Sequence, residues 1–343
     1  MTQSITTLGE FLQAGNANYQ VFDLGRCLTE LDKAQFDAIE RQQQPYPYPI
    51  RRHAQLAVLF RHQQQADNDY LWFIQLPLDE RGLLNVAARD HYLEFVVNAL
   101  GNEITGALTD EQEEQLKQNP YLFTPNETQR AALHARINVS RHGEPSIYFE
   151  DAAQFLLKPT EQWQQLGMQG IHDCAARLNQ LPELTEAIAQ QFIRYPAPVR
   201  QQLAAALEHQ TVPARLRDAL VNIAKTADSH DMRNDALRAL ASCSQHGGVA
   251  KCIKQGLQDS EFLDANGLTI VAARLWPTLT DNDTLKDYLA AITPLSQALF
   301  DALFQDIISL PGIRPQVLAL LAQGQLSEDT LQALNRLTNQ AQG

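Results

Sequence analysis

Two stretches that lie 33 residues apart, PVRQQLAAALE (198–208) and DMRNDALRALA (231–241), decide the fold of this chain. Arg200 recurs as Arg233, and the apolar residues that follow each arginine recur at the same offsets. Their spacing is that of one face of an amphipathic helix. A fixed period of roughly 20–50 residues is typical of stacked structural units rather than of one globular core.

The helix that follows each stretch repeats at the same period. Leu216 and Leu220 recur as Val249 and Ile253, so the repeating unit is a helical hairpin rather than one helix. From residue 161 onward, strand patterns are absent, and proline, glycine or polar clusters separate helix-length segments. We predict helices at 161–179, 182–194, 197–208, 212–225, 231–243, 248–258, 261–275, 282–291, 294–308, 313–322 and 327–338.

The N-terminal part mixes strand and helix patterns. Two β-prone runs, AQLAVLF (54–60) and YLWFIQLPL (70–78), flank a polar loop and predict a β-hairpin. A strand is predicted at 20–24, a strand-like segment within INVSRHGEPSIYF (137–149), and helices at 29–44, 86–100, 110–118, from about 126, and at 150–157. We therefore predict an α+β domain over 1–160, built on a small antiparallel sheet, followed by an all-α helical-hairpin solenoid over 161–343.

Composition excludes several classes of function. The 343 residues are 44% hydrophobic and 20% charged, as in a folded protein, and the formal net charge is −13. Residues 1–160 carry 13 basic against 21 acidic side chains, and the remainder carry 14 against 19. This balance disfavours nucleic acid as a partner, because phosphate binding needs a basic surface. No apolar run is long enough to span a bilayer, and MTQSITTLGEFLQAGNANYQ (1–20) does not resemble a secretory signal. We expect a cytoplasmic protein without membrane contact.

No motif in the chain specifies a reaction or a cofactor. The sequence lacks a G-x-S-x-G nucleophile motif, a G-x-x-x-x-G-K-[ST] phosphate loop and an H-E-x-x-H zinc motif. Cys243, His246 and Cys252 could supply three zinc ligands, but a structural zinc site needs four. Two core cysteines and a loop histidine explain them better. The sequence therefore assigns no catalytic, cofactor-binding or metal residues, and no cofactor.

One acid pair leaves an enzyme open as the alternative. Asp90 and Glu94 share a face of the predicted helix at 86–100 and could act as general acid and base. The polar face of an amphipathic helix is the better interpretation of this spacing. The enzyme hypothesis then needs a site in the N-terminal domain or at the domain junction.

The segment DMRNDALRALASCSQHGGVAKCIKQGLQDS (231–260) resembles a HEAT-like repeat. The resemblance lies in the Asp-x-Arg start, the small-residue face, the short loop and the closing Asp-Ser. It implies that Arg233 pairs with Asp259 or Asp231 of a neighbouring unit. Asn266 replaces the arginine in the next unit, which implies an interruption of this series of pairs.

The chain as a whole resembles a gammaproteobacterial family known only as a domain of unknown function. DYLWFIQLPLDERGLLNVAARDHYLEFVVNALG (69–101) and NPYLFTPNETQRAALHARINVS (119–140) carry this resemblance, together with the total length. It implies a bacterial cytoplasmic protein and supplies no activity or site residues.

Stacked helical hairpins favour a non-enzymatic scaffold or adaptor that binds a protein or peptide partner on an extended surface. We expect the second helix of each hairpin to line that surface. The basic residues that would contact an acidic partner there are Arg215, Arg217, Lys251 and Lys254.

Overall fold

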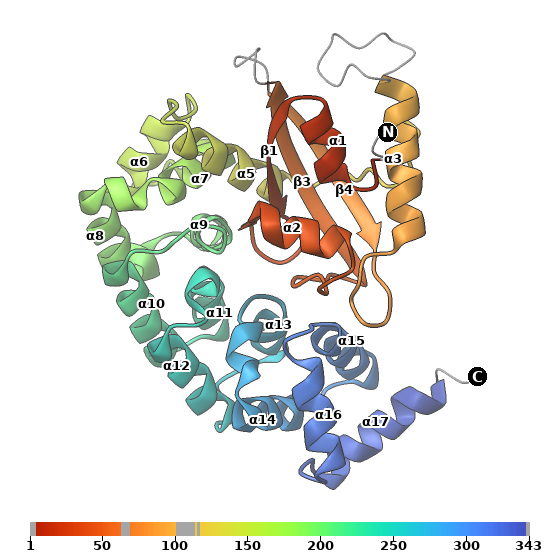
Figure 1. The fold of residues 1–343 in the computed structure, drawn as a ribbon. Coiled ribbons are helices and arrows are strands. Elements are labelled where there is room, and N and C mark those ends of the chain that lie inside the picture. Colours follow the sequence, from red (N-terminus) through yellow and green to blue (C-terminus); the bar gives the residue numbers. More distant parts are fainter. Residues whose placement is uncertain (1–4, 63–68, 101–113, 115–116, 341–343) are drawn as a thin grey trace. The chain divides into compact units, whose positions relative to one another are not determined.

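The computed structural model describes residues 5–62, 69–100, 114 and 117–340. The described chain forms two compact units (Figure 1). The sheet unit comprises the residues up to Pro125 together with Ser309–Pro311, and the helical unit comprises Asn126–Ile308 and the residues from Gly312 onward. The helix predicted at 110–118 lies largely outside the described residues.

The sheet unit contains a four-stranded antiparallel sheet with the strand order β2-β1-β3-β4. The predicted hairpin is confirmed, because β3 and β4 pair in register with Leu56 opposite Ile74. On the outer edge of β4, the Gln75 N–H donates a hydrogen bond of 2.7 Å to the Tyr121 carbonyl. The chain around Tyr121 therefore covers this edge strand. The elements of this unit are α1 (Leu8–Ala14), β1 (Ala17–Asp23), β2 (Thr29–Leu31), α2 (Lys33–Glu40), β3 (His53–His62), β4 (Tyr70–Pro77) and α3 (Val86–Leu100).

The helix predicted at 29–44 is wrong at its beginning. Thr29–Leu31 forms β2, where Leu31 pairs with Val21 and is buried. The helix begins only after Asp32, whose side chain accepts a hydrogen bond from the Gln35 N–H and so caps α2. Pairing with β1 overrides the local helical pattern.

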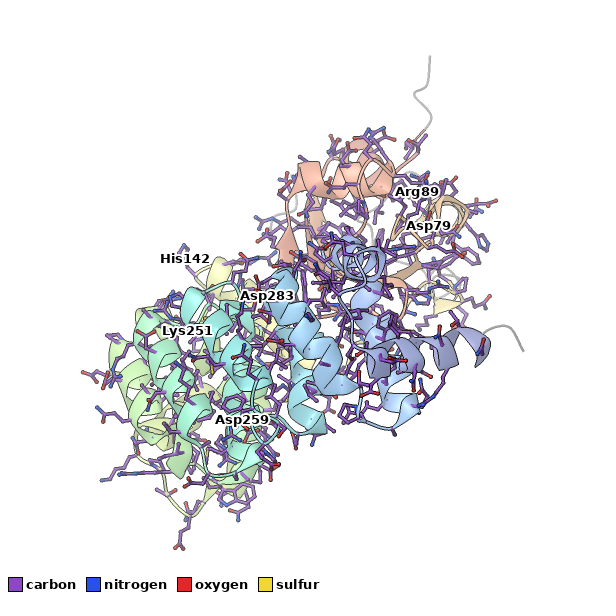
Figure 2. All side chains as sticks on the ribbon, turned by 90° about the horizontal axis from the view of Figure 1, so that it is seen from below. Asp79, Arg89, His142, Lys251, Asp259 and Asp283 are labelled. Carbon is purple, nitrogen blue, oxygen red and sulfur yellow. The ribbon has the colours of Figure 1, made fainter. Side chains whose placement is uncertain are left out.

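Asp79, which is labelled in Figure 2, shapes the connection from β4 to α3. Its Oδ1 accepts hydrogen bonds of 2.8 Å from the backbone N–H groups of Arg81 and Leu83. Gly82 takes a φ of +79° within this turn, a conformation that glycine adopts without strain. The turn therefore fixes where α3 begins relative to the sheet.

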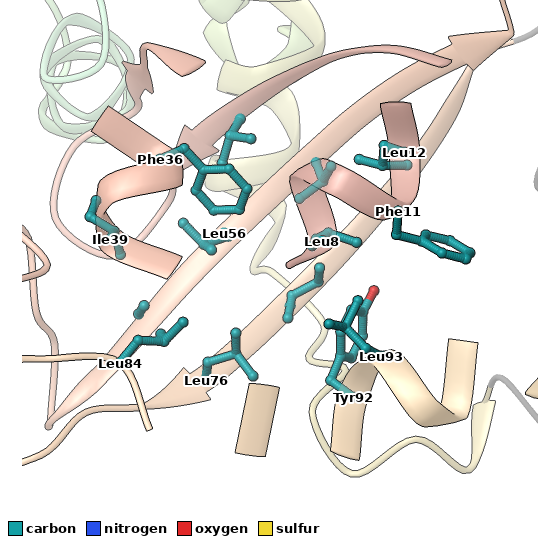
Figure 3. Close-up of a cluster of buried hydrophobic side chains, with 14 of the residues drawn as sticks. Leu8, Phe11, Leu12, Phe36, Ile39, Leu56, Leu76, Leu84, Tyr92 and Leu93 are labelled. Carbon is teal, nitrogen blue, oxygen red and sulfur yellow. The ribbon is translucent and has the colours of Figure 1, made fainter. Parts of the chain in front are cut away.

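One hydrophobic cluster holds the sheet unit together. Residues from α1, α2 and α3 pack with the apolar side chains of one face of the sheet (Figure 3). Phe36 and Ile39 come from α2, and Tyr92 comes from α3. Because alternate strand residues point to the same face, the alternation in YLWFIQLPL places Ile74 and Leu76 in this cluster.

The helical unit is built of two layers in which each helix packs on the next of its own layer. The first layer contains α5 (Glu127–Ser140), α7 (Met168–Ala176), α9 (Ala197–Leu207), α11 (His230–Ala239), α13 (Ala265–Arg274), α15 (Gln297–Ile308) and α17 (Glu328–Gln340). The second layer contains α6 (Phe149–Leu157), α8 (Pro182–Gln191), α10 (Ala214–Thr226), α12 (Gly247–Leu257), α14 (Asn282–Ile292) and α16 (Arg314–Ala322). In Figure 1 the second layer follows the outer side of the unit's curve.

The apolar residues of the 33-residue pattern occupy buried positions of these helices. Leu203 and Leu207 of α9 are fully buried, as are Ala236 and Leu237 of α11. The pattern therefore marks the positions at which the layers meet. The strand-like segment predicted at 137–149 is wrong, because α5 continues to Ser140 from a capping box at Asn126.

The ion pair that the HEAT-like resemblance implies for Arg233 is not present. Arg233 instead donates hydrogen bonds to the backbone carbonyls of Ala224, Ala227 and Phe262. Its guanidinium also lies 4.5 Å from the centroid of the Phe262 ring. Carbonyl groups left without partners at the end of α10 are close enough to satisfy this arginine, so it needs no carboxylate.

The compact units divide between Pro125 and Asn126, and the domain boundary at residue 160 stays a prediction. The difference concerns α5 and α6, which both pack against α7. Leu133 of α5 and Leu156 of α6 are almost fully buried within the helical unit. Their burial makes these two helices part of its core.

Candidate functional site

The basic residues predicted to bind a partner lie on α10 and α12, in the second layer. Arg215 forms a two-pronged ion pair with Glu186 of α8, with both N–O distances 2.8 Å. Arg217 pairs with its neighbour Asp218 at 2.8 Å. Both cations are therefore neutralised by acids of the same surface.

The two lysines of α12 differ from each other. Lys254 lies 3.0 Å from Asp281 and 3.3 Å from Asp283, two acids at the start of α14. Lys251 is exposed and has no ion-pair partner within the described part of the chain (Figure 2). The structure thus brings acids to three of the four predicted residues, and their binding role stays a prediction.

The first layer carries two adjoining hollows. The first has a volume of about 290 Å³ and the second about 420 Å³, and both are bordered by Gln201 and Arg238. The first hollow is lined by Thr128, Met168, His172, Pro198, Gln201, Gln202, Ala205 and Arg238. The second is lined by Gln201, Asp231, Asn234, Asp235, Arg238, Asn266, Thr269, Ile270, Ala273 and Arg274. Because they share two residues, we treat them as one polar groove that extends over α5, α7, α9, α11 and α13.

A buried carboxylate lies beneath this groove. Glu208, which follows α9, is 1% exposed and receives hydrogen bonds of 2.6 and 3.1 Å from Arg238 and of 3.1 Å from Arg274. Burial alone would raise its pKa, but the attraction of Arg274 and the hydrogen bond from Arg238 lower the pKa below its ordinary value. Glu208 is therefore a fixed anion that ties α9 to α11 and α13.

Two histidines lie near this carboxylate. His209 Nε2 is 3.2 Å from Glu208 Oε1, and His172 belongs to the lining of the first hollow. Burial lowers the pKa of His172 and of His209 to about 4, so both imidazoles are neutral at pH 7. Nδ1 of His172 is buried and has no hydrogen-bond partner among the described residues.

Asn234 supplies a second polar atom without a partner. Its Nδ2 donates a hydrogen bond of 3.0 Å to Asp264 Oδ1, which fixes the orientation of the carboxamide because a carboxylate can only accept. Oδ1 of Asn234 then has no donor within the described chain. A Cβ atom at Gly267 would lie 2.8 Å from this oxygen, so a larger residue at this position would clash with the Asn234 carboxamide.

Within the described residues of the sheet unit, the carboxylates of Asp23 and Glu40 are buried, and each holds a different part of the backbone. Asp23 accepts hydrogen bonds from the Tyr46 hydroxyl and from the N–H groups of Gly25 and Arg26, and burial raises its pKa to about 7. Asp23 and Tyr46 are both 0% exposed, so a substrate has no access to this pair. The pair fixes the loop between β1 and β2.

Glu40 at the end of α2 is 2% exposed. Its carboxylate accepts hydrogen bonds of 2.7 Å from the Leu8 N–H and 3.0 Å from the Gly9 N–H, at the beginning of α1. Thr7 accepts from the next donor, the Glu10 N–H, at 3.1 Å. The first turn of α1 therefore has all three of these donors satisfied by side chains.

The acid pair considered for general acid–base chemistry is not isolated. Asp90 accepts hydrogen bonds from Arg89 at 2.7 and 3.0 Å, while Glu94 is exposed one turn further along α3. Arg89 also donates to the backbone carbonyl of Glu40. Asp90 thus helps to hold an arginine that joins α3 to α2.

In the cysteine and histidine group, Cys252 lies within α12, His246 is the N-cap residue of that helix, and Cys243 precedes it. Cys252 is buried, Cys243 is half-buried, and His246 caps α12 by accepting the Gly248 N–H at 3.2 Å. Among the residues that the structure describes, no three His, Cys, Asp or Glu side chains are grouped so that they could hold a metal ion. Nor does any helix of the described ranges have the length and apolar character to cross a membrane.

The spacing of two carboxamide residues in the sequence could have indicated the groove, although the basic residues did not. Gln201 and Asn234 are one 33-residue period apart, so successive first-layer helices present carboxamides at equivalent positions. Arg238 lies one turn beyond Asn234 on the same face of α11. Glu208 and His172 gave no such signal, because their proximity depends on how the helices stack.

No curated protein and no solved structure matches this chain. A family model described as "Protein of unknown function (DUF3549)" matches residues 3–338, which is nearly the whole chain. The chain therefore belongs to the DUF3549 family.

Proposed function

We propose that this protein is an interaction scaffold whose helical unit is a HEAT-like solenoid and binds an extended segment of a partner protein in the polar groove. The observation that carries this proposal is the continuity of the two hollows, which share Gln201 and Arg238. Stacked hairpins offer extended surfaces of this kind. His172 and Asn234, which line the groove, each also have one buried polar atom without a hydrogen-bond partner among the described residues.

The dimensions of the groove suit a peptide. Neighbouring packed helices lie about 8–10 Å apart, so the three steps from α7 to α13 span roughly 27 Å. An extended chain rises about 3.3 Å per residue, and about eight residues would fill that length. A surface that crosses several helices and lacks one deep centre favours an extended segment over a small molecule.

The enzyme alternative has weaker support. Glu208 is held by two arginines, and its lowered pKa suits a permanent anion rather than a proton donor. Asp23 has a pKa near neutrality but is enclosed with Tyr46. Asp90 is engaged by Arg89. None of these acids combines a suitable pKa with access for a substrate.

We also propose a cellular location and a domain boundary for the protein. We place it in the bacterial cytoplasm, as the family resemblance implies. The four cysteines of the chain are few and irregularly spaced, which is typical of proteins in a reducing compartment. We further propose that the helical unit folds as a domain of its own, beginning at α5.

The test is affinity purification of partners by the full chain and by two surface variants, quantified by mass spectrometry. Thr269→Glu alters an exposed position in the groove, and Lys251→Glu alters an exposed position in the second layer. We expect Thr269→Glu to reduce recovery of a specific partner by about tenfold, as loss of one good contact does. Lys251→Glu should recover it as the parent chain does.

Both variants should melt at the temperature of the parent chain, because neither residue is buried. Partner recovery that survives Thr269→Glu and is lost in Lys251→Glu would reject the groove and support the second-layer surface instead.

A further inference from the structure

We propose that the first hollow binds the free C-terminal carboxylate of the peptide in the groove, with Arg238 as its main ligand. This inference rests on the proposed function and adds the chemistry of the partner. A chain terminus would lie between α7, α9 and α11, and the preceding residues would continue through the second hollow toward α13.

The hydrogen bonds of Arg238 leave part of its guanidinium available. Nε and Nη2 donate to the two oxygens of Glu208, at 2.6 and 3.1 Å. Nη1 has no acceptor among the described residues, and the side chain is 35% exposed. A guanidinium carries five N–H donors in a fixed plane, so the edge that is turned away from Glu208 can bind a second carboxylate.

The charged residues around the groove favour the first hollow as the site of the terminal carboxylate. Arg238 is the charged residue among those that line the first hollow, and Glu208 beneath it is 1% exposed. The acids that line the groove, Asp231 and Asp235, border only the second hollow. Asp235 is paired with Arg200 at 2.7 Å. Arg274 also borders the second hollow, where it donates to Glu208. An anion is therefore favoured in the first hollow, which no acid borders, and disfavoured beside Asp231.

The remaining lining residues suit the last residue of a chain. Met168, Pro198 and Ala205 offer apolar contacts for one side chain within the volume of about 290 Å³. Thr128 comes from α5, the first helix of the unit, so the hollow lies at the beginning of the stack. His172 also borders this hollow, and its imidazole is neutral, so it adds no charge beside Arg238.

The experiment uses the immobilised full chain and a pool of octapeptides of random sequence, prepared once with free C-terminal carboxylates and once with C-terminal amides. Retained peptides are eluted and quantified by mass spectrometry. We expect the free-acid pool to be retained about tenfold more than the amide pool, because charge-assisted hydrogen bonds are roughly twice as strong as neutral ones.

Arg238→Lys tests the residue directly. A lysine can keep the ion pair with Glu208 but loses the second edge, so the preference for free acids should disappear while the chain still folds. Arg215→Lys is the matched control, because Arg215 makes the same two-pronged contact with Glu186 on the second layer. The control should keep the preference.

The other outcomes separate this inference from the proposed function. Equal retention of both pools, with both reduced by Thr269→Glu, would overturn the carboxylate site and leave the peptide groove standing. Selection of internal Asp or Glu from the amide pool would overturn the terminal carboxylate as the source of the anion. Retention of neither pool above the bare matrix would reject both proposals.

Discussion

Arg200 of α9 and Asp235 of α11 form an ion pair across successive helices of the first layer, with 2.7 Å between Nε and Oδ2. The two side chains are 8% and 11% exposed. Burial raises the pKa of Asp235, against the hydrogen bond and the charge of Arg200. The pair therefore links two helices, although burying its two charges costs desolvation energy. Removing one partner should therefore destabilise the chain more than replacing both partners with apolar residues.

We predict that Asp235→Ala lowers the free energy of unfolding by about 3–5 kcal/mol, because it leaves a buried cation without its partner. The double variant Arg200→Met with Asp235→Leu should recover most of that loss. Urea denaturation followed by circular dichroism measures both. Arg215→Ala, which breaks an exposed pair, should leave the unfolding midpoint nearly unchanged. A double variant no more stable than Asp235→Ala would contradict this account.

Asp23 should make stability depend on pH. Its pKa is raised by burial from an ordinary 3.8 to about 7. The folded chain thus binds this proton more tightly than the unfolded chain does, so the contribution of Asp23 to stability is fully present below about pH 4 and is lost as the pH rises through 7. His172 and His209, whose pKa values are lowered to about 4, contribute with the opposite sign. Asp23→Asn should reduce this slope in urea titrations between pH 4 and 8. Glu40, with its pKa also raised to about 7, should retain part of it.

Glu94→Gln serves as the control for this titration, because Glu94 is exposed on α3. It should keep the parent slope. A parent slope that persists in Asp23→Asn would show that the carboxyl group does not titrate in this range.

Two glycines of the helical unit should respond in opposite ways to alanine. A Cβ atom at Gly170 would lie 2.1 Å from the backbone oxygen of Tyr148, while one at Gly247 would meet nothing within 4 Å. We predict that Gly170→Ala destabilises the chain by at least about 2 kcal/mol, since neither backbone can yield easily. Gly247→Ala should be neutral or stabilising by about 0.5 kcal/mol. Thermal denaturation compares them, and equal melting temperatures would refute the close contact.

The beginning of the helical domain can be tested with two fragments. A fragment of residues 126–343 keeps α5 and α6, whereas residues 161–343 leave α7 without these two helices, which both pack against it. We predict cooperative thermal unfolding for the longer fragment and a lower melting temperature or aggregation for the shorter one. Equal stability of the two fragments would favour a domain boundary at residue 160.

Local patterns predicted the elements that depend on local chemistry. Alternating apolar residues gave β3 and β4, and Asn126 with Gln129 gave the beginning of α5 through its capping box. The pattern failed at Thr29–Leu31, because pairing with β1 is a contact between distant residues. It also failed at the end of α5, where a helix that packs on α7 continues through the half-buried, β-prone residues Ile137 and Val139.

The candidate site was harder to predict for the same reason. Basic residues are visible in a sequence, so Lys254 was an obvious choice, but its acids on α14 become neighbours only after stacking. Glu208 and Arg274 are further apart along the chain, by 66 residues. A sequence reveals which residues share a helix face, and the order of the layers determines which faces remain open.

The contact between Glu40 and α1 has a consequence for synthesis. Leu8 and Gly9 leave the ribosome well before Glu40, the residue that accepts their N–H groups. A helix of seven residues is too short to persist alone in water. α1 must therefore remain unformed until α2 has emerged, and these two helices do not fold in the order in which they are translated.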